Sequence, residues 1–348
     1  MSHPTEAIST TDGPTTGTDA DRSSAGDATR IGRRRYLVGA GAAAVATLSG
    51  CTESLGMTGG GGETVTVLLT PDNPSEVQKD YEPMMNYLNE EVDGAEFEAR
   101  VPTDYSAILP ALKSEKAEIG MDDITMISAP EELDVLGTTV AGGTAFYFSM
   151  MLTRDDTGVE EPADMEGKTM AFADPLSTSG SLYAVYELKR AGLDIGEAPG
   201  SDEGADFDGN WSDHQNAVEQ VLNEEADACC TWGGNGMRFV PEDQLTDEVK
   251  EKSAFVDEAG SEDEQLTVVT FSEPIPNQPV YARASWDSPI KDEMRDRLLA
   301  LESGDLDEYT PDDYDGEIPF ERLKDTTEED YQPVIDVVDE LGIDLTQE

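Results

Sequence analysis

The sequence has little of what most enzymes and nucleic-acid-binding proteins need. Its 348 residues include three cysteines and two histidines, and two histidines cannot supply a catalytic zinc site on their own. There is no Walker-type loop and no constellation of metal ligands. Lys and Arg number 22 and form no basic patch, which argues against nucleic acid as a partner. We therefore expect neither a metal nor another cofactor.

Negative charge, in contrast, is abundant. Asp and Glu number 76, and the formal net charge is −54. Residues 1–50 contain five acids and five arginines, so the whole excess lies on residues 51–348. At ordinary ionic strength this self-repulsion opposes the compact state, whereas molar salt screens it. Because apolar periodicity persists through the body, we interpret the chain as a folded protein adapted to high salt rather than a disordered one.

The N-terminal part reads as a targeting segment. Residues 1–29 are rich in Ser, Thr, Gly and Asp, which predicts a disordered leader. Residues 30–51 place Arg33 and Arg34 before an apolar run that is short for a membrane span, as in a twin-arginine signal peptide. The run ends in "LSGC", which resembles a lipobox and predicts lipidation of Cys51. Residues 52–62 then form a flexible tether.

This signal predicts export by the twin-arginine route and anchoring on the outer face of the cytoplasmic membrane. Twin-arginine export carries folded proteins, which suits a chain that folds in a salty cytoplasm. An uncleaved membrane anchor is the alternative. The two remaining cysteines, Cys229 and Cys230, are adjacent and do not form a disulfide framework. We interpret them as small buried strand residues, with a reactive or metal-binding pair as the alternative.

Apolar patterns in the body alternate between the strand and the helix period. The patterns predict strands at 64–70, 95–101, 118–121, 144–153, 167–173 and 267–283, and helices at 73–92, 105–117, 180–192, 287–302 and 329–341. Residues 214–230 are predicted to form a helix that runs into a strand. The acidic, Gly-rich stretch 194–213 reads as a surface loop. Calcium binding there is the weaker alternative, because the stretch lacks the spacing of an EF-hand.

This order of elements predicts an α/β protein with two lobes, each a mainly parallel sheet flanked by helices, joined by two crossover strands. Residues 63–153 and 274–348 are assigned to lobe 1 and residues 154–273 to lobe 2. Open α/β sheets bind ligands outside the carboxyl ends of their strands, so we expect a cleft between the lobes.

The stretch "DPLSTSG" lies at this position in the second lobe, between a strand and a helix. A helix start offers unpaired backbone N–H groups and a positive dipole end, which together bind an oxyanion without lysine. Ser177, Thr178 and Ser179 add hydroxyl donors, and Gly180 allows close approach. The alternative is that Ser177 or Ser179 merely caps the helix.

The order of several motifs resembles that of the solute-binding proteins of phosphonate, phosphite and phosphate ABC transporters. "STSGS" resembles the phosphoryl-cradling loop of that family, and "EADACC" fits its x-Asp-[Ala/Val] strand. "TDYSAI", "FYFSMML" and "SDHQNAVEQV" resemble the family's ligand-contacting segments and match Tyr105, Tyr147 and His214. The resemblance covers roughly residues 63–300 and implies the type II periplasmic-binding-protein fold, whose lobes close on the ligand.

The resemblance also implies roles for the individual residues. Tyr105 and Tyr147 would donate phenol O–H groups from the first lobe, although both also fit as core aromatics. His214 would donate to a ligand oxygen with its protonation adjustable near neutrality, although a histidine at a helix start is more often a surface residue. Trp232 would cap or narrow the pocket, with a core tryptophan as the alternative.

Two departures from the family pattern bear on the ligand. Aminoalkylphosphonate binders of this family pair acidic residues with the ammonium group of the ligand. In this chain "TWGGNG" (231–236) follows the matching strand, and Gln278 stands at the second acidic position. A buried ammonium without a counter-charge is costly, so we expect an amine-free anion: phosphate, phosphite or a simple alkylphosphonate.

Together these observations predict a lipid-anchored solute-binding protein that delivers a phosphorus oxyanion to an ABC permease and its ATPase, acts as a monomer and performs no catalysis. One alternative is a ligand-sensing domain of a membrane signalling protein. The other is an enzyme on the same fold, for which Cys229, Cys230 and His214 are the candidate nucleophile and base.

Overall fold

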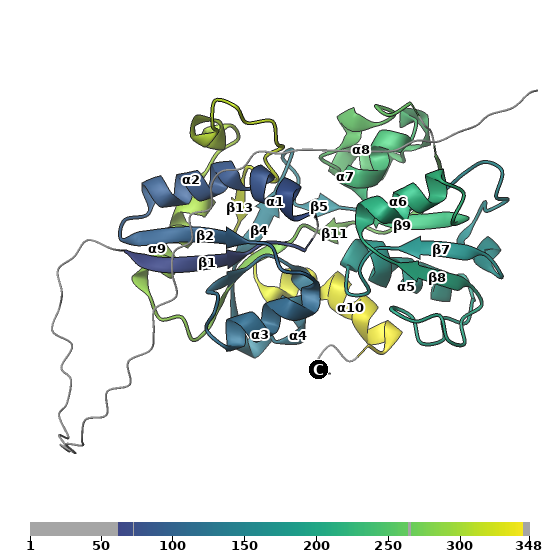
Figure 1. Cartoon of the computed structure of the whole chain (residues 1–348), viewed down its shortest axis with the longest axis horizontal. Coiled ribbons are helices and arrows are strands. Elements are labelled where there is room, and N and C mark those ends of the chain that lie inside the picture. The colour runs from purple at the N-terminus through teal and green to yellow at the C-terminus, as the bar shows by residue number, and fades with distance from the viewer. Residues whose placement is uncertain (1–61, 72, 264–265, 344–348) are drawn as a thin grey trace, which may run out of the picture. The chain divides into compact units, whose positions relative to one another are not determined.

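Two mixed sheets and a short connecting ladder form the framework of the protein in the computed structural model, which describes residues 62–71, 73–263 and 266–343 (Figure 1). The described residues belong to one compact unit. The predicted leader, signal peptide, tether and Cys51 lie outside the described residues. Every helix in the described ranges is too short or too polar to span a membrane.

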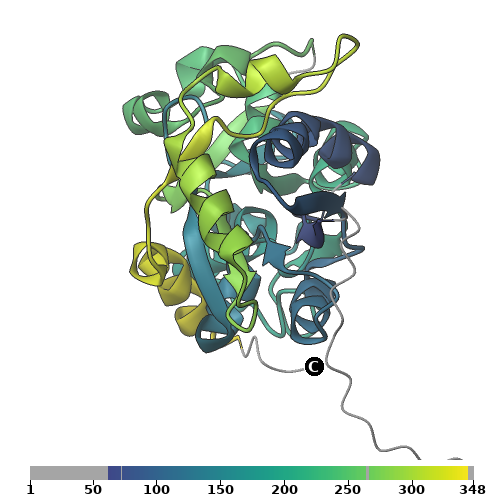
Figure 2. The ribbon, with the colours of Figure 1, turned by 90° about the vertical axis from the view of Figure 1, so that its left-hand side faces the viewer.

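The first lobe is built on a six-stranded sheet with helices on both faces. Helices α2 (Glu82–Glu91) and α9 (Pro289–Ala300) share a hydrophobic core on one face, and α3 (Ile108–Lys113), α4 (Asp123–Ser128) and α10 (Gln332–Leu341) share the core of the other. Viewed from its end, this lobe has α2 and α10 on opposite sides (Figure 2). The strands, in spatial order, are β13 (Arg322–Lys324), β4 (Leu133–Val140), β12 (Pro279–Arg283), β3 (Ile119–Gly120), β1 (Glu63–Leu68) and β2 (Ala95–Arg100).

The second lobe is built on a five-stranded sheet. Helices α6 (His214–Leu222), α7 (Gly233–Gly236) and α8 (Asp247–Lys252) lie over one face, and α5 (Tyr183–Arg190) covers the other (Figure 1). Cys229 packs into the first of these cores and Cys230 into the second, as expected for neighbouring strand residues. The strands, in order, are β10 (Thr267–Phe271), β6 (Ser149–Thr153), β9 (Ala228–Trp232), β7 (Thr169–Phe172) and β8 (Asp208–Trp211).

The predicted α/β class with helix-flanked sheets is confirmed, but the sheets are mixed rather than mainly parallel. In the first sheet β1 pairs in parallel with β2 and β3, whereas β12 and β13 run antiparallel to β4. In the second sheet β6 is antiparallel to both β9 and β10. Strand β6, which enters the second lobe, lies between β10 and β9, and β12, which follows the return to the first lobe, lies between β4 and β3.

Two short strands carry the chain between the lobes. Strands β5 (Phe146–Tyr147) and β11 (Ile275–Pro276) pair antiparallel in a ladder of their own, which agrees with the prediction of two crossover strands. The predicted lobe boundary after residue 153 differs from the pairing, because β6 belongs to the second sheet. Helix α10 adds a third link, since Val334, Val337 and Val338 pack in one core with Leu182 and Tyr183.

Three predicted elements are divided in the structure. The helix predicted at 73–92 breaks at Tyr81 into α1 (Pro74–Asp80) and α2, because Pro83 begins a new helix and cannot continue the old one. The predicted strand 144–153 separates into β5 and β6, and 267–283 into β10, β11 and β12. The predicted surface loop 194–213 contains edge strand β8, which is held by pairing to β7 and by the stack of Trp211 on Phe172, with ring centroids 4.9 Å apart.

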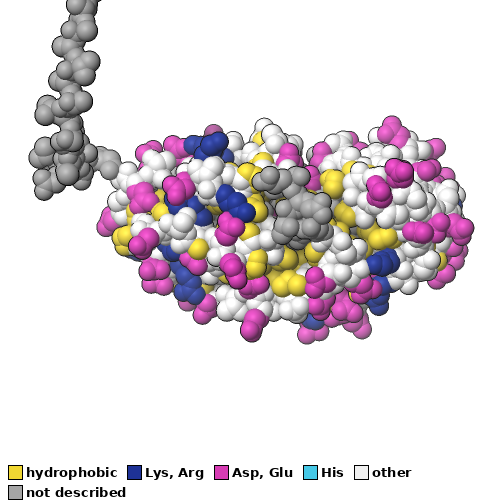
Figure 3. Space-filling model, turned by 90° about the horizontal axis from the view of Figure 1, so that it is seen from below, with side chains coloured by type: hydrophobic (Ala, Val, Ile, Leu, Met, Phe, Trp, Pro, Cys, Tyr) yellow, Lys and Arg dark blue, Asp and Glu magenta, His cyan; other side chains and the backbone are white. Residues whose placement is uncertain are grey.

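Acidic side chains dominate the visible charge. On the face seen from below, Asp and Glu side chains are scattered over the surface, whereas Lys and Arg form only small groups (Figure 3). Many cations of the described residues are paired, such as Lys291 with Asp134 at 2.7 Å and Arg297 with Glu91 at 2.9 Å. Exposed pairs of this kind contribute little to stability, so they offset only a small part of the repulsion.

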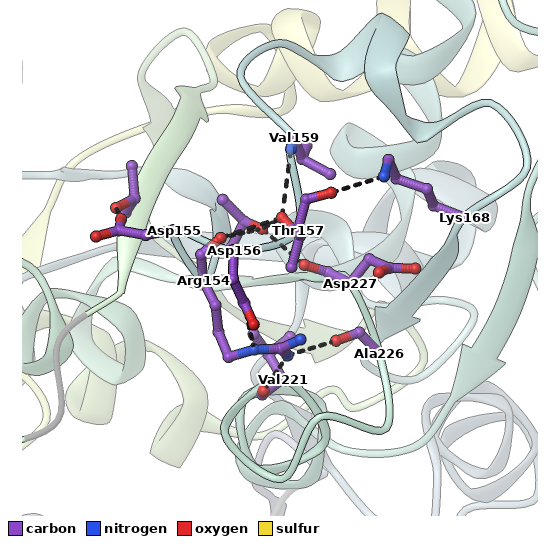
Figure 4. A network of polar contacts seen from close by, with 11 residues as sticks. Arg154, Asp155, Asp156, Thr157, Val159, Lys168, Val221, Ala226 and Asp227 are labelled. Atoms are coloured by element: carbon purple, nitrogen blue, oxygen red, sulfur yellow. Dashed lines mark hydrogen bonds and ion pairs between the residues drawn. The ribbon is translucent and has the colours of Figure 1, made fainter.

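A network of polar contacts in the second lobe joins the residues after β6 to the end of α6 and to the start of β9 (Figure 4). The Arg154 guanidinium donates to the Val221 and Ala226 carbonyl oxygens, which lie at and beyond the end of α6. The Asp227 carboxylate accepts from the Thr169 backbone N–H at 2.9 Å, at the start of β7. The Val221 carbonyl also accepts from the Glu224 backbone N–H at 3.1 Å, so Arg154 adds a second donor there and ties the end of α6 to the Ala226 carbonyl.

Candidate functional site

A cleft of about 1100 Å³ opens between the lobes. Its lining includes eight of the nine ligand-binding residues predicted from the sequence, and the ninth, Gly180, belongs to the same loop as Ser177, Thr178 and Ser179. The eight are Tyr105, Tyr147, Ser177, Thr178, Ser179, His214, Trp232 and Gln278. The structure therefore brings together residues that are up to 173 positions apart in the sequence.

The loop after β7 begins a helix in an unusual way. The Ser177 hydroxyl accepts from the Gly180 backbone N–H at 3.2 Å, so Ser177 is an N-cap. The next turn, Thr178–Leu182, is π-helical, and the Leu182 N–H bonds to the Ser177 carbonyl at 3.0 Å. The α-helical geometry of α5 starts only at Tyr183. Single π-helical turns are common at functional sites, and this one widens the helix start where the hydroxyls face the cleft.

The packing around the loop leaves no room for a side chain at position 180. A Cβ at this position would lie 2.3 Å from the Ala173 Cβ and 2.8 Å from the His214 Cε1. The loop thus packs directly on β7 and on the start of α6, and any side chain at position 180 would push the loop away from the imidazole. Close approach to the protein's own groups, rather than to a ligand, explains the glycine.

His214 lines the cleft, but its ring packs against the loop at Ser177 and Gly180. Its Nε2 is 3.1 Å from the Ser177 Oγ, and its Nδ1 is 3.1 Å from the Thr231 Oγ1. The residue keeps partial solvent exposure, but burial of its ring lowers the pKa to about 4, against a smaller opposing effect of Asp213. The expectation that its protonation is adjustable near neutrality is therefore wrong, because the imidazole is neutral throughout that range.

The low pKa of His214 predicts a pH dependence of stability. An unfolded histidine has a pKa of about 6.5. Between about pH 6.5 and pH 4, His214 is therefore protonated in the unfolded chain and neutral in the folded chain. Stability is therefore lost as the pH falls through this window. Between about pH 7 and pH 5 we expect the wild type to lose about 2 kcal/mol more unfolding free energy than His214→Gln, measured by urea titration in molar KCl. Equal losses would mean that folded His214 still titrates normally.

Tyr105 and Tyr147 reach the cleft from different elements of the first lobe. Tyr105 is buried at the start of a short turn that follows β2, where the Asp104 carboxylate accepts from the Ala107 N–H at 3.1 Å. Tyr147 lies on β5 opposite Ile275, within the ladder that joins the lobes. Both tyrosines line the same cleft as the Ser177 loop.

Gln278 and Trp232 also line the cleft, each with neighbours that fix it. The Gln278 amide accepts from the Thr70 hydroxyl and donates to the Tyr81 hydroxyl, so its orientation is set within the first lobe. Burial raises the pKa of Tyr81 well above its usual value. Trp232 packs edge-on against Phe255, with ring centroids 5.0 Å apart, and its ring leaves no room for a side chain at Gly234.

Several acidic residues of the cleft were not predicted from the sequence, and the buried one among those that the structure describes is Asp122. Asp122 is 1% exposed, and its two carboxylate oxygens accept from the Thr125 N–H at 2.6 Å and from the Tyr281 hydroxyl at 2.5 Å. Gly120 makes room for that hydroxyl, since a Cβ there would lie 2.4 Å from it. The available signal was its position directly after β3, where parallel strands place ligand-binding residues.

The two cations that line the cleft among the described residues are each paired with a carboxylate. Lys79 lies 2.9 Å from the Asp315 carboxylate, and Arg238 lies 3.6 Å from Glu258. These are the cations among the described lining residues, and neither belongs to the loop that holds Ser177. The donors at the loop are therefore hydroxyls and backbone N–H groups.

The cysteines fit a structural role. Cys229 and Cys230 are buried as free thiols, and burial raises the pKa of Cys229 to about 12 and raises that of Cys230 as well. A thiol that stays protonated is a poor nucleophile. Within the described residues no group of His, Cys, Asp and Glu side chains could hold a metal ion.

Comparison with known proteins agrees with this architecture. Residues 67–331 match the family described as "ABC transporter, phosphonate, periplasmic substrate-binding protein". The phosphate-import protein PhnD of Mycolicibacterium smegmatis is 27% identical over 139 residues, which are 38% of this chain and 43% of that protein. The chain thus matches less than half the length of this relative.

Solved structures support the fold. A binding protein component of an ABC phosphonate transporter from Pseudomonas aeruginosa has a TM-score of 0.61 at 17% identity, covering 80% of this chain and 86% of that one. PhnD1 from Prochlorococcus marinus in complex with methylphosphonate has a TM-score of 0.60 at 14% identity, covering 80% and 98%. The predicted type II periplasmic-binding-protein fold is confirmed.

Proposed function

Because the chain belongs to the family of periplasmic substrate-binding proteins of phosphonate ABC transporters, we propose that it captures a small phosphorus oxyanion outside the cytoplasm and delivers it to an ABC permease and its ATPase. The observation that carries the proposal is the capped helix start at Ser177–Gly180, whose hydroxyl residues line the same cleft as Tyr105 and Tyr147. In this role the chain binds its ligand and leaves it chemically unchanged.

Neutral donors explain how so acidic a protein holds an anion. The first N–H groups of the helix, the Ser177 and Ser179 hydroxyls and the two phenols are dipoles, and they act over hydrogen-bond distance. The net charge of −54 acts over longer distances and is screened when the Debye length falls to about 3 Å in molar salt. Local binding and global repulsion therefore do not compete under salty conditions.

The ligand is proposed to be amine-free: phosphate, phosphite or a simple alkylphosphonate. Phosphate and methylphosphonate appear in the names of the two relatives above. Gln278 is uncharged and is held by Thr70 and Tyr81, and the stretch 231–236 carries no carboxylate. Asp122 is the buried carboxylate among the described lining residues, and protein donors already bond to both of its oxygens.

Lobe closure is the proposed binding motion. The lobes are joined by the ladder of β5 and β11, and short connecting strands of this kind act as hinges in two-lobed binding proteins. Tyr147 lies on this ladder, so ligand contact at its phenol would be coupled directly to the hinge. The cleft of about 1100 Å³ is far larger than a phosphate ion, which leaves room for closure.

The remaining features of the proposal concern export and assembly. The Arg33–Arg34 pair and the "LSGC" stretch support export by the twin-arginine route and lipidation of Cys51. The mature protein would then be held on the outer face of the cytoplasmic membrane by a lipid alone and act as a monomer. Metabolic labelling with palmitate, compared between the wild type and Cys51→Ala, tests the anchor.

A calorimetric panel tests the ligand class. The full chain is titrated in molar KCl with phosphate, phosphite, methylphosphonate, 2-aminoethylphosphonate and sulfate. We expect at least one amine-free phosphorus oxyanion to bind more tightly than 2-aminoethylphosphonate and sulfate. Tighter binding of 2-aminoethylphosphonate than of every amine-free phosphorus oxyanion would contradict the amine-free assignment. Loss of this preference for 2-aminoethylphosphonate in Asp122→Asn would then place the ammonium at Asp122.

A further inference from the structure

A line of four side chains leads from the surface of α7 to the Ser177 hydroxyl. Asn235 begins it: its Nδ2 lies 2.9 Å from the His214 carbonyl oxygen and 2.9 Å from the Thr231 Oγ1. A carbonyl oxygen only accepts hydrogen bonds, so the amide group facing it must be the NH₂. The orientation of Asn235 is thereby fixed, and its second N–H donates to Thr231.

The Thr231 hydroxyl links Asn235 to His214 and determines the direction of the next hydrogen bond. Its side chain is fully buried, and among the described residues its hydroxyl has two partners, Asn235 Nδ2 and His214 Nδ1. The first is a donor, so the Thr231 O–H can only be satisfied by donating to His214 Nδ1. A neutral imidazole that accepts at Nδ1 carries its proton at Nε2.

Ser177 receives the last hydrogen bond of the line. The His214 Nε2–H points to the Ser177 Oγ at 3.1 Å, and the Gly180 N–H donates to the same oxygen at 3.2 Å. These two donors occupy both lone pairs of the hydroxyl oxygen. The Ser177 proton is then left for an acceptor outside this network, and Ser177 lines the cleft.

We propose that Asn235, Thr231 and His214 are positioning residues that hold Ser177 as an obligate hydrogen-bond donor to the ligand. A hydroxyl held in this way cannot accept from an N–H or O–H group, so the ligand atom at this position must act as a hydrogen-bond acceptor. Burial of the imidazole supports the assignment, because a protonated His214 would repel the Thr231 hydroxyl proton. The inference rests on the proposed function only for the identity of the acceptor.

The tautomer of His214 is measured without any ligand. Long-range ¹H–¹⁵N correlation spectra of the full chain, with His3 replaced by alanine so that one histidine contributes, distinguish a protonated from an unprotonated ring nitrogen. We expect a protonated Nε2 and an unprotonated Nδ1 near neutral pH. A proton on Nδ1, or on both nitrogens, overturns the proposal.

Two substitutions at one position then test the effect on binding. Thr231→Val keeps the shape but removes the hydroxyl, so His214 is no longer held in one tautomer and Ser177 can donate to it instead of to the ligand. We expect affinity for phosphate or methylphosphonate to fall about tenfold or more, whereas Thr231→Ser, which restores the hydroxyl, stays within about threefold of wild type. Unchanged affinity in Thr231→Val overturns the proposal.

The two measurements separate this proposal from the proposed function. If the tautomer is as expected but phosphate, phosphite and methylphosphonate all fail to bind, the proposed function fails and the assigned hydrogen-bond directions stand. If Thr231→Val does not fold, two other results still test the proposal. One is the His214 tautomer in the ¹H–¹⁵N correlation spectrum. The other is the affinity of Thr231→Ser, because loss of binding in that variant contradicts the proposal.

Discussion

Replacing Ser177 with alanine is expected to weaken binding of phosphate or methylphosphonate by about 10- to 100-fold. The change removes a hydroxyl donor to a charged ligand, which contributes about 1.5–3 kcal/mol, and each 1.4 kcal/mol is about a factor of ten in affinity. It also strands the His214 Nε2–H and the Gly180 N–H, which now bond to the Ser177 oxygen. Calorimetry in molar KCl measures the loss.

A second capping serine provides the control. Ser288 is the N-cap of α9, where its hydroxyl accepts from the Ile290 N–H at 3.3 Å, and it is not among the described residues that line the cleft. In both Ser177→Ala and Ser288→Ala the missing cap should cost about 1 kcal/mol of stability, and each variant also loses one further side-chain hydrogen bond, to His214 or to Glu63. Only Ser177→Ala should lose affinity. Equal affinity of the two variants would show that Ser177 is a helix cap and nothing more.

Lowering the salt concentration is expected to have the largest effect on stability. From about 1 M to about 0.1 M KCl the Debye length grows from about 3 to about 10 Å, so repulsion among the carboxylates on residues 51–348 reaches beyond nearest neighbours. A domain with a net stability of about 5–15 kcal/mol cannot absorb much of this cost. We expect the midpoint of thermal unfolding to fall by about 10 °C or more, corresponding to several kcal/mol.

The cause of this loss can be separated from general solvent effects. Tetramethylammonium chloride at the same ionic strength should restore most of the midpoint, because screening depends on ionic strength. Sucrose favours compact states without adding ions and should restore less. A midpoint that is constant between about 0.1 and 1 M KCl would contradict the interpretation of the acidic composition as salt adaptation.

The sequence analysis was most accurate where a pattern is local. The apolar alternation of β1, the spacing of α6 and the buried Cys229–Cys230 pair followed from their own neighbours along the chain. Strand β4 was missed because its stretch "LDVLGTTV" has no regular alternation and contains Gly137. It becomes a strand through pairing with β12 and β13, which follow more than 130 residues later.

In the candidate site, too, local motifs could be predicted from the sequence and roles that depend on distant residues could not. The hydroxyl-rich loop at 177–180 was recognisable from four consecutive residues. Thr231, Asn235 and Asp122 were not, because each has an ordinary sequence environment and gains its role from groups that the fold brings to it. The prediction for His214 failed for the same reason: only the packing of Gly180 and Thr231 around the ring shows that its pKa is lowered to about 4.

A crystal structure of the full chain grown in molar KCl with methylphosphonate would test the central claim most directly. The account predicts that the anion lies in the cleft with its oxygens within about 2.5–3.2 Å of the Ser177 and Ser179 hydroxyls on one side and of the Tyr105 and Tyr147 hydroxyls on the other. An anion bound instead to Arg238 or Lys79 at the rim, with the Ser177 loop unoccupied, would contradict it.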